Sequence, residues 1–202
     1  MFAATSIVVI FRLTLHCKGL LGIMRPMVEP TRTTAISSRA WYSAPLAEFL
    51  ETQAAVIVGR LAINGEFSLL LSQRDAWLAQ ITFLQENLLG LSGALFLEFN
   101  IPRMGRRIDA VLLIGPVVFV VEFKVGESVF ERAAVDQVWD YALDLKNFHE
   151  ASHSVSIVPI LIATGSSPSA RMDLQVDEDK VYRPILICPN DFRRAIERTC
   201  ER

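Results

Sequence analysis

The sequence predicts a single α/β domain of three layers, with a central mixed sheet flanked by helices. Two observations predict it. The segments 107–114 and 117–124 are almost continuously apolar, and strands that are apolar on both faces are covered on both sides. Segments with the spacing of amphipathic helices come before and after these strands, so helices are the elements available to cover them.

The first half of the chain supplies the first helices and three strands. The segment 45–58 has helical spacing after a serine and proline entry, Ser43-Ala44-Pro45. The clearer helix is 72–89, where four large apolar side chains form one narrow stripe at i, i+4, i+7 and i+11: Trp77, Ile81, Leu84 and Leu88. Strands are expected at 94–100, 107–114 and 117–124, the last two joined by a tight turn at Gly115-Pro116.

The second half alternates helices and strands. A long helix is expected over 129–150, with a buried face formed by Val135, Val138, Ala142 and Leu145. Strands follow at 156–163 and 181–188. The last element, 191–202, is predicted to be a charged helix capped by Asn190.

Length, composition and charge set the class of protein. With 202 residues, about half of them apolar, the chain suits one well-packed domain and is neither disordered nor a disulfide mini-protein. Its net charge of −2 argues against binding nucleic acid through bulk positive charge but allows a local basic patch. The odd set Cys17, Cys188 and Cys200 has no zinc-finger spacing and favours a reduced, cytoplasmic location. Cys188 is expected to be buried.

Residues 1–30 differ from the rest and are expected to lie outside the domain, which we place at 31–202. The apolar run 6–15 is interrupted by Arg12, His16 and Lys18, well short of the ~20 residues of a membrane span. Because Met24 and Met27 are plausible start codons, an upstream extension is our main interpretation. A packing or interfacial helix and a targeting or membrane segment are the alternatives, and no membrane partner is expected.

Three charged side chains are predicted to meet at one end of the sheet. Strand alternation places Glu122 and Lys124 on the same face of 117–124. Asp109 lies in the preceding hairpin strand, and adjacent strands are only about 4.8 Å apart. Two carboxylates and a backbone carbonyl, that of Phe123, make the oxygen site that Mg²⁺ or Mn²⁺ prefers. Lys124 could then position water or stabilise charge on a phosphate, the chemistry of phosphodiester hydrolysis. A structural ion pair at the sheet end is the alternative.

The spacing resembles a known signature. Asp109, twelve residues, then Glu122-Phe123-Lys124 resembles the PD-(D/E)XK nuclease motif, and Gln137 and Tyr141 resemble the Gln-x-x-x-Tyr element of its RecB-like branch. The resemblance implies a restriction-endonuclease-like fold, Asp109 and Glu122 as metal ligands, Lys124 as the catalytic cation, and Gln137 and Tyr141 in phosphate contact or DNA positioning. Packing at the rim of the core is the alternative for Gln137 and Tyr141.

A closer resemblance covers residues 39–188. The segments 39–43, 98–113 and 140–153 resemble an uncharacterised nuclease-like domain that precedes Schlafen-like helicase domains in bacteria. No GxxxxGK[ST] phosphate loop occurs in the sequence. A helicase domain or protein is therefore an expected partner rather than part of this chain.

Many members of the superfamily add a glutamate from the helix before the sheet. On a helical wheel Glu86 faces away from the apolar stripe, while Gln80 lies nearer the stripe, where the glutamate is expected. Gln80 is the poorer metal ligand. Either the site uses fewer carboxylates, Glu98 contributes instead, or the metal binds weakly.

Two further motifs have more than one interpretation. The loop 102–107 contains Arg103, Arg106 and Arg107 beside Asp109, and these arginines either grip phosphates or form a solvated turn. The segment 149–153 matches HExxH. A zinc protease needs both histidines on one continuous helix, whereas His153 is expected at or past the helix end. A cationic or hydrogen-bonding role at the helix terminus is preferred.

The sequence therefore predicts a Mg²⁺- or Mn²⁺-dependent nuclease acting on nucleic acid, DNA more than RNA. The alternative is a nuclease-fold module that binds nucleic acid or regulates a helicase without cleaving. A third interpretation, an inert fragment of a longer protein, predicts poor solubility through an exposed apolar face.

Overall fold

A six-stranded mixed sheet forms the centre of the protein, as seen in a computed structural model that describes residues 39–65, 71–101, 105–168 and 172–201. Its strands lie in the order β1-β2-β3-β4-β5-β6. They span Ala40–Pro45, Gly93–Asn100, Arg107–Ile114, Val117–Lys124, Ser156–Ala163 and Ile185–Ile187. The strands β1 to β4 pair antiparallel, whereas β4, β5 and β6 pair parallel. This confirms the predicted α/β class and the mixed sheet.

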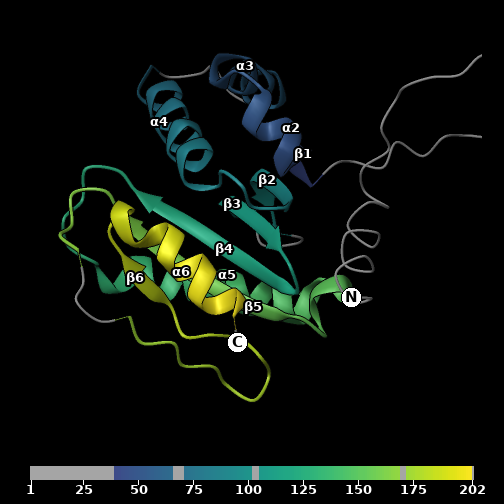
Figure 1. The fold of residues 1–202 in the computed structure, drawn as a ribbon, viewed down its shortest axis with the longest axis vertical. Coiled ribbons are helices and arrows are strands. Elements are labelled where there is room, and N and C mark those ends of the chain that lie inside the picture. Colours follow the sequence, from purple (N-terminus) through teal and green to yellow (C-terminus); the bar gives the residue numbers. More distant parts are fainter. Residues whose placement is uncertain (1–38, 66–70, 102–104, 169–171, 202) are drawn as a thin grey trace, which may run out of the picture.

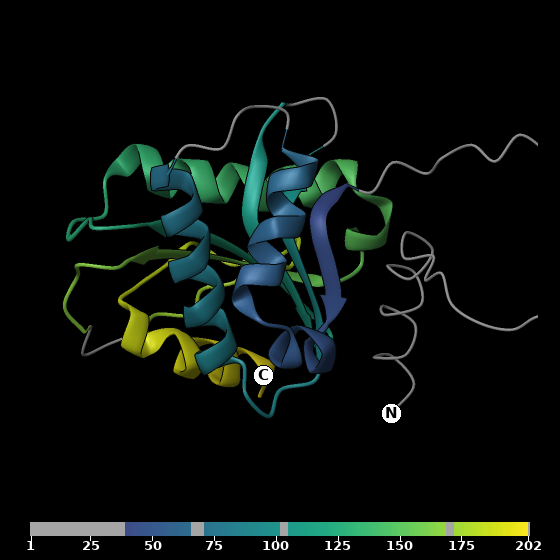
Figure 2. The same ribbon diagram turned by 90° about the horizontal axis from the view of Figure 1, so that it is seen from above.

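Helices cover both faces of the sheet (Figure 1). They are α2 Leu46–Glu51, α3 Ala54–Asn64, α4 Leu71–Asn87, α5 Arg132–Phe148 and α6 Phe192–Cys200. The side chains of α2, α3, α4 and α6 join one buried apolar cluster, and those of α5 join a second one on the other face. Figure 2 shows α5 and α6 on opposite sides of the strands. The predicted three layers are present.

The strands β3 and β4 agree residue for residue with the predicted segments. Gly115 adopts φ +58°, a left-handed conformation that glycine takes without a side-chain clash, and so allows the two-residue turn between them. Near the start of β2, Gly93 has φ +154°, and a Cβ there would lie 1.9 Å from the carbonyl oxygen of Leu113. The hairpin and its neighbour therefore depend on glycine at two positions.

The prediction of one continuous helix over 45–58 is wrong, because this segment contains two helices, α2 and the first part of α3, with a break between them. The chain leaves the helix at Thr52, whose hydroxyl donates to the carbonyl of Glu48 at 2.7 Å. From α4, Gln85 Nε2 donates to the carbonyls of Phe49 and Thr52 at 2.8 and 2.7 Å. These bonds satisfy the carbonyls that the break between α2 and α3 releases.

Further boundaries differ from prediction, and α5 spans Arg132–Phe148 rather than 129–150. The strand β1 was not expected, although Ala40, Tyr42 and Ala44 alternate with partly exposed residues in the pattern of a half-buried strand. The strand predicted over 181–188 is reduced to Ile185–Ile187, because Val181 and Tyr182 form isolated bridges instead. The cap of α6 is Asp191 rather than Asn190.

The segments 1–38, 66–70, 102–104 and 169–171 lie outside the described residues. The predictions for residues 1–30, Cys17 and Arg103 fall there. Cys188 is buried, as predicted. No helix among the described ranges is long and apolar enough to cross a membrane.

Candidate active site

Asp109 and Glu122 lie opposite each other on the adjacent strands β3 and β4. Ala110 pairs with Val121, so the antiparallel register places the two acidic residues side by side one position further along. The backbone N–H of Phe123 donates to Asp109 Oδ2 at 2.9 Å, which fixes the orientation of this carboxyl group. The sheet therefore brings together the two carboxylates that the sequence placed in separate strands.

Glu122 is 5% exposed, and its two oxygens have different surroundings. Lys124 Nζ and Gln137 Nε2 each donate to Oε1 at 3.1 Å. Lys124 Nζ also donates to Gln137 Oε1 at 3.2 Å, which closes a three-membered network. The buried Oε2 has no hydrogen-bond partner among the described residues. Because buried polar atoms are almost always satisfied, this oxygen needs an explanation.

The helix α5 supplies the other two predicted residues. Ala134, Val138, Ala142 and Leu145 pack its apolar face onto the sheet. Gln137 and Tyr141 are one helical turn apart, so they lie together over the end of β4, and Gln137 Nε2 donates to Tyr141 Oη at 2.6 Å. Tyr141 is only 3% exposed, so its ring is buried in the core beneath α5. Asp109, Glu122, Lys124, Gln137 and Tyr141 thus converge at one place.

The carboxyl groups of Asp109 and Glu122 have too little positive charge around them to offset their burial. Burial raises the pKa of Asp109 well above its usual value, and the negative charge of Glu122 raises it further. Burial also raises the pKa of Glu122, although Lys124 and the backbone N–H of Asp109 act in the opposite direction. For Tyr141, burial raises the pKa, and the charges of Glu122 and Asp109 add to this effect. Added positive charge would stabilise the ionised carboxylates.

A divalent cation fits the donor set of Asp109 and Glu122. The described residues contain no group of three or more His, Cys, Asp or Glu side chains arranged to hold a metal. Mg²⁺ is commonly bound through one or two carboxylates, with water and substrate phosphate as its other ligands. The unpartnered Oε2 of Glu122 is an oxygen that such an ion would satisfy. The backbone carbonyl of Phe123 stays a predicted third ligand.

Glu98, the other acidic candidate, is held by its own partners. It is 7% exposed, with Trp77 Nε1 donating to Oε1 at 2.7 Å and Arg107 Nε donating to Oε2 at 2.9 Å. Its backbone has φ +50°, a costly conformation for a residue with a side chain. The Arg107 guanidinium also lies 4.2 Å from the ring centroid of Trp41. Both oxygens of Glu98 are satisfied, so it does not replace a helix glutamate as a ligand.

The predicted basic loop has one arginine directed toward the α5 side of the site. Arg106 lies 3.7 Å from the carboxylate of Asp140 on α5, an exposed ion pair. Arg107 is held by Glu98 and Trp41, so its geometry is that of a structural cation. The ion pair with Glu98 and the indole N–H of Trp77 were not expected from the sequence, where Trp77 reads only as part of an apolar stripe.

The helix α4 lies on the other face of the sheet from the carboxylates. Its side chains Trp77, Ile81 and Leu84 pack in the first of the two buried apolar clusters, to which α5 contributes no side chain. Gln80 lines a cavity together with Phe123, whose side chain points away from Glu122. The expectation that Gln80 occupies the position of a metal-binding helix glutamate is therefore wrong. Glu86 is exposed, as predicted.

The HExxH segment does not form a zinc site. The helix α5 ends at Phe148, and a short 3₁₀ turn, Glu150–Ser152, separates the two histidines. His149 Nδ1 lies 2.7 Å from Ser152 Oγ, and burial lowers the pKa of His149 to about 4. The hydrogen-bonding role suggested for this helix end is present, whereas a cationic His149 at neutral pH is not.

Comparison with known proteins gives no family assignment. No protein-family model matches the chain. No curated protein matches it. No solved structure matches it. Any functional conclusion must therefore come from the geometry of the site.

Proposed function

We propose that this protein is a divalent-metal-dependent nuclease that hydrolyses phosphodiester bonds of nucleic acid, DNA before RNA. The observation that carries the proposal is the buried Glu122 carboxylate, with one oxygen held by Lys124 and Gln137 and the other unpartnered, directly opposite Asp109. A structural ion pair would use both oxygens, as Glu98 does. The resemblance to the PD-(D/E)XK signature supports the same chemistry.

Asp109 and Glu122 would hold the cation, with the carbonyl of Phe123 as a further ligand. When bound, the cation supplies a Lewis acid for the scissile phosphate and lowers the pKa of a bound water. The hydrogen bond from the N–H of Phe123 keeps Asp109 oriented without using both of its oxygens. The pair is therefore arranged before the substrate arrives, which limits the cost of reorganisation.

Lys124 contributes the positive charge of the reaction. Its ammonium group lies 3.1 Å from Glu122 Oε1, and the side chain as a whole is 30% exposed, so Lys124 can contact a phosphate while remaining bound to the carboxylate. There it would stabilise the negative charge that develops on the phosphoryl oxygens. Gln137 accepts from the same ammonium group and receives its own orientation from Tyr141. Gln137 and Tyr141 thus act as positioning residues for Lys124.

The test is cleavage of labelled single- and double-stranded DNA and RNA with Mg²⁺ or Mn²⁺. Asp109→Ala and Lys124→Ala remove the two charges of the site, and Asp136→Ala on the exposed side of α5 is the matched control. We expect metal-dependent cleavage that is lost in the first two variants and kept in the third. Folded protein that binds nucleic acid in EDTA but cleaves none of these substrates would favour a binding module instead.

A further inference from the structure

A second feature of the same sheet end is a cavity on the opposite face from the carboxylates. It has a volume of about 240 Å³ and lies at the carboxyl ends of β4 and β5, with Gln80, Phe83, Phe123, Val125, Ile162 and Thr164 in its lining. Cavities that hold drug-sized molecules measure about 300–1,000 Å³. This cavity therefore suits a smaller, flat group such as one nucleobase.

The accessible surface of the cavity is almost entirely apolar and includes aromatic side chains. The rings of Phe83 and Phe123 meet edge to face with centroids 5.7 Å apart. Gln80 and Thr164 are the lining residues with polar side chains, and the Thr164 hydroxyl already accepts a hydrogen bond from Gly126 N. Flipped or unpaired bases are bound in this way, between aromatic or apolar side chains with hydrogen bonds to their edges.

The cavity and the candidate active site share the end of β4. Along this strand Glu122 and Lys124 project to the α5 face, and Phe123 projects to the α4 face, because side chains alternate. The backbone of the same residues is fixed, since Thr164 N donates to the Lys124 carbonyl at 3.1 Å and Gly126 N donates to Thr164 Oγ1 at 2.7 Å. A nucleic-acid strand crossing the end of β4 meets both sets of side chains.

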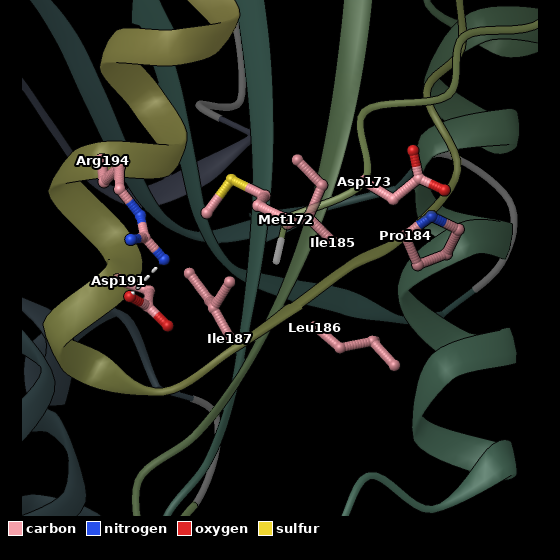
Figure 3. A pocket seen from close by; sticks show the side chains of 8 residues that line it. All are labelled: Met172, Asp173, Pro184, Ile185, Leu186, Ile187, Asp191 and Arg194. Atoms are coloured by element: carbon pink, nitrogen blue, oxygen red, sulfur yellow. Dashed lines mark hydrogen bonds and ion pairs between the residues drawn. The ribbon is translucent and has the colours of Figure 1, made fainter. Parts of the chain in front are cut away.

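A second cavity, of about 270 Å³, lies between β6 and α6 and is drawn in Figure 3. Its polar groups include Asp173 and the ion pair in which Arg194 donates to Asp191 at 2.8 Å. Two carboxylates around one paired guanidinium are a poor match for a phosphate or a base. The cavity beside β4 is the better candidate for a nucleic-acid subsite.

We propose that the cavity lined by Gln80, Phe83 and Phe123 receives one unpaired base of the strand whose phosphate lies at Asp109, Glu122 and Lys124. The inference rests on the proposed function and adds to it a substrate class: single-stranded nucleic acid, or a duplex from which one base is turned out. Gln80 then contacts substrate from the opposite face of the sheet, rather than standing in for a metal-binding glutamate.

The test is an abasic scan of a single-stranded DNA oligonucleotide, with affinity measured by fluorescence anisotropy in EDTA and cleavage measured in Mn²⁺. We expect one abasic position to weaken binding about tenfold, because stacking of a base on aromatic side chains is lost there. Gln80→Leu should weaken binding of the intact oligonucleotide about three- to tenfold and have no effect on the oligonucleotide that lacks this base. Gln73→Leu, on an exposed position of α4, is the matched control.

The outcomes separate this inference from the proposed function. Equal affinity at every abasic position, or a Gln80→Leu effect that is the same with and without the base, overturns the base subsite even if Mn²⁺-dependent cleavage is seen. Base-dependent binding without cleavage keeps the subsite and overturns hydrolysis. No binding of the oligonucleotide at all overturns both. The wild-type scan requires no variant, so a misfolded Gln80→Leu protein leaves the inference testable.

Discussion

Glu98 in β2 and Glu122 in β4 are buried to nearly the same degree, at 7% and 5% exposure, in one sheet. The carboxylate of Glu98 accepts one hydrogen bond on each oxygen, from Trp77 and Arg107. The carboxylate of Glu122 accepts two on Oε1 and none on Oε2 from the described residues. Burial alone therefore does not separate the two glutamates, but the distribution of their partners does.

The hydrogen-bond partners of a buried carboxylate distinguish a structural role from a functional one. A buried charge is tolerated when it is paired and fully hydrogen-bonded, and removing a partner is costly. Glu98 meets that condition, even at the expense of a backbone with φ +50°. Glu122 does not, and its negative charge raises the pKa of the neighbouring Asp109, which burial has already raised. We interpret Glu98 as part of the framework and Glu122 as part of the chemistry.

The largest expected effect is on activity. Glu122→Gln keeps the side-chain shape but removes the charge opposite Asp109, and cleavage should fall at least about 100-fold because a metal ligand contributes several kcal/mol to the transition state. The free energy of unfolding should change by less than about 1 kcal/mol. Cleavage rates in Mn²⁺ and urea unfolding measure the two quantities. A variant that cleaves normally would remove Glu122 from the chemistry.

For Glu98 we expect the reverse, a substitution that acts mainly on the free energy of unfolding. Glu98→Gln places an amide NH₂ against the N–H donor of either Trp77 or Arg107. The free energy of unfolding should fall by about 2 kcal/mol, since hydrogen bonds to charged groups contribute about 1.5–3 kcal/mol each. Urea unfolding of this variant beside Glu122→Gln makes the comparison direct. Equal stability of Glu98→Gln and wild type would show that the two glutamates do not differ as described.

The raised pKa of Asp109 predicts that the stability of the metal-free protein depends on pH. Its pKa is raised on folding, by burial and by Glu122, so the folded state holds its proton more strongly than the unfolded state does. Stability therefore decreases as the pH rises from about 4, the unfolded pKa, through the raised folded pKa. Asp109→Asn should be more stable by about 1 kcal/mol near pH 8 and equal to wild type below about pH 4. A pH-independent difference between the two proteins in EDTA would contradict this.

The smallest effect on cleavage is expected for Tyr141, which joins the network of Glu122, Lys124 and Gln137 only through Gln137. Tyr141→Phe keeps the buried ring but removes the hydroxyl that accepts from Gln137 at 2.6 Å. Cleavage should fall about three- to tenfold, with a change in kcat rather than KM, because Lys124 loses some of its orientation through Gln137. Tyr182→Phe, a buried tyrosine between β5 and the loop before β6, is the matched control. Equal losses in both variants would indicate packing alone.

Much of the sheet could be predicted from the sequence. The strands β3, β4 and β5 are continuous apolar runs with turns at their ends, and their bounds agree with prediction. The pairing of Asp109 with Glu122 follows from a two-residue hairpin turn, because the turn fixes the register. The helix α5 follows from its periodicity, which also places Gln137 and Tyr141 together.

The remaining features depend on tertiary contacts that no local pattern contains. The break at Thr52 is stabilised by Gln85, 33 residues away. A helical wheel relates Gln80 to its own helix but does not say which face of the sheet α4 covers, so its expected place in the metal site was wrong. The structural role of Glu98 depends on hydrogen bonds from Trp77 and Arg107, which lie in other elements. Nothing in the sequence indicates that the backbone of Glu98 adopts a positive φ, a conformation that glycine favours.

We interpret Asp109 and Glu122 as a divalent-cation site and Glu98 as a structural residue outside it. The most direct measurement is a calorimetric titration of Mn²⁺ into the wild-type protein, Glu122→Gln and Glu98→Gln. We expect saturable binding to wild type that is weakened at least about tenfold in Glu122→Gln and unchanged in folded Glu98→Gln. Binding that Glu98→Gln removes and Glu122→Gln leaves intact, or no saturable binding to wild type, would contradict it.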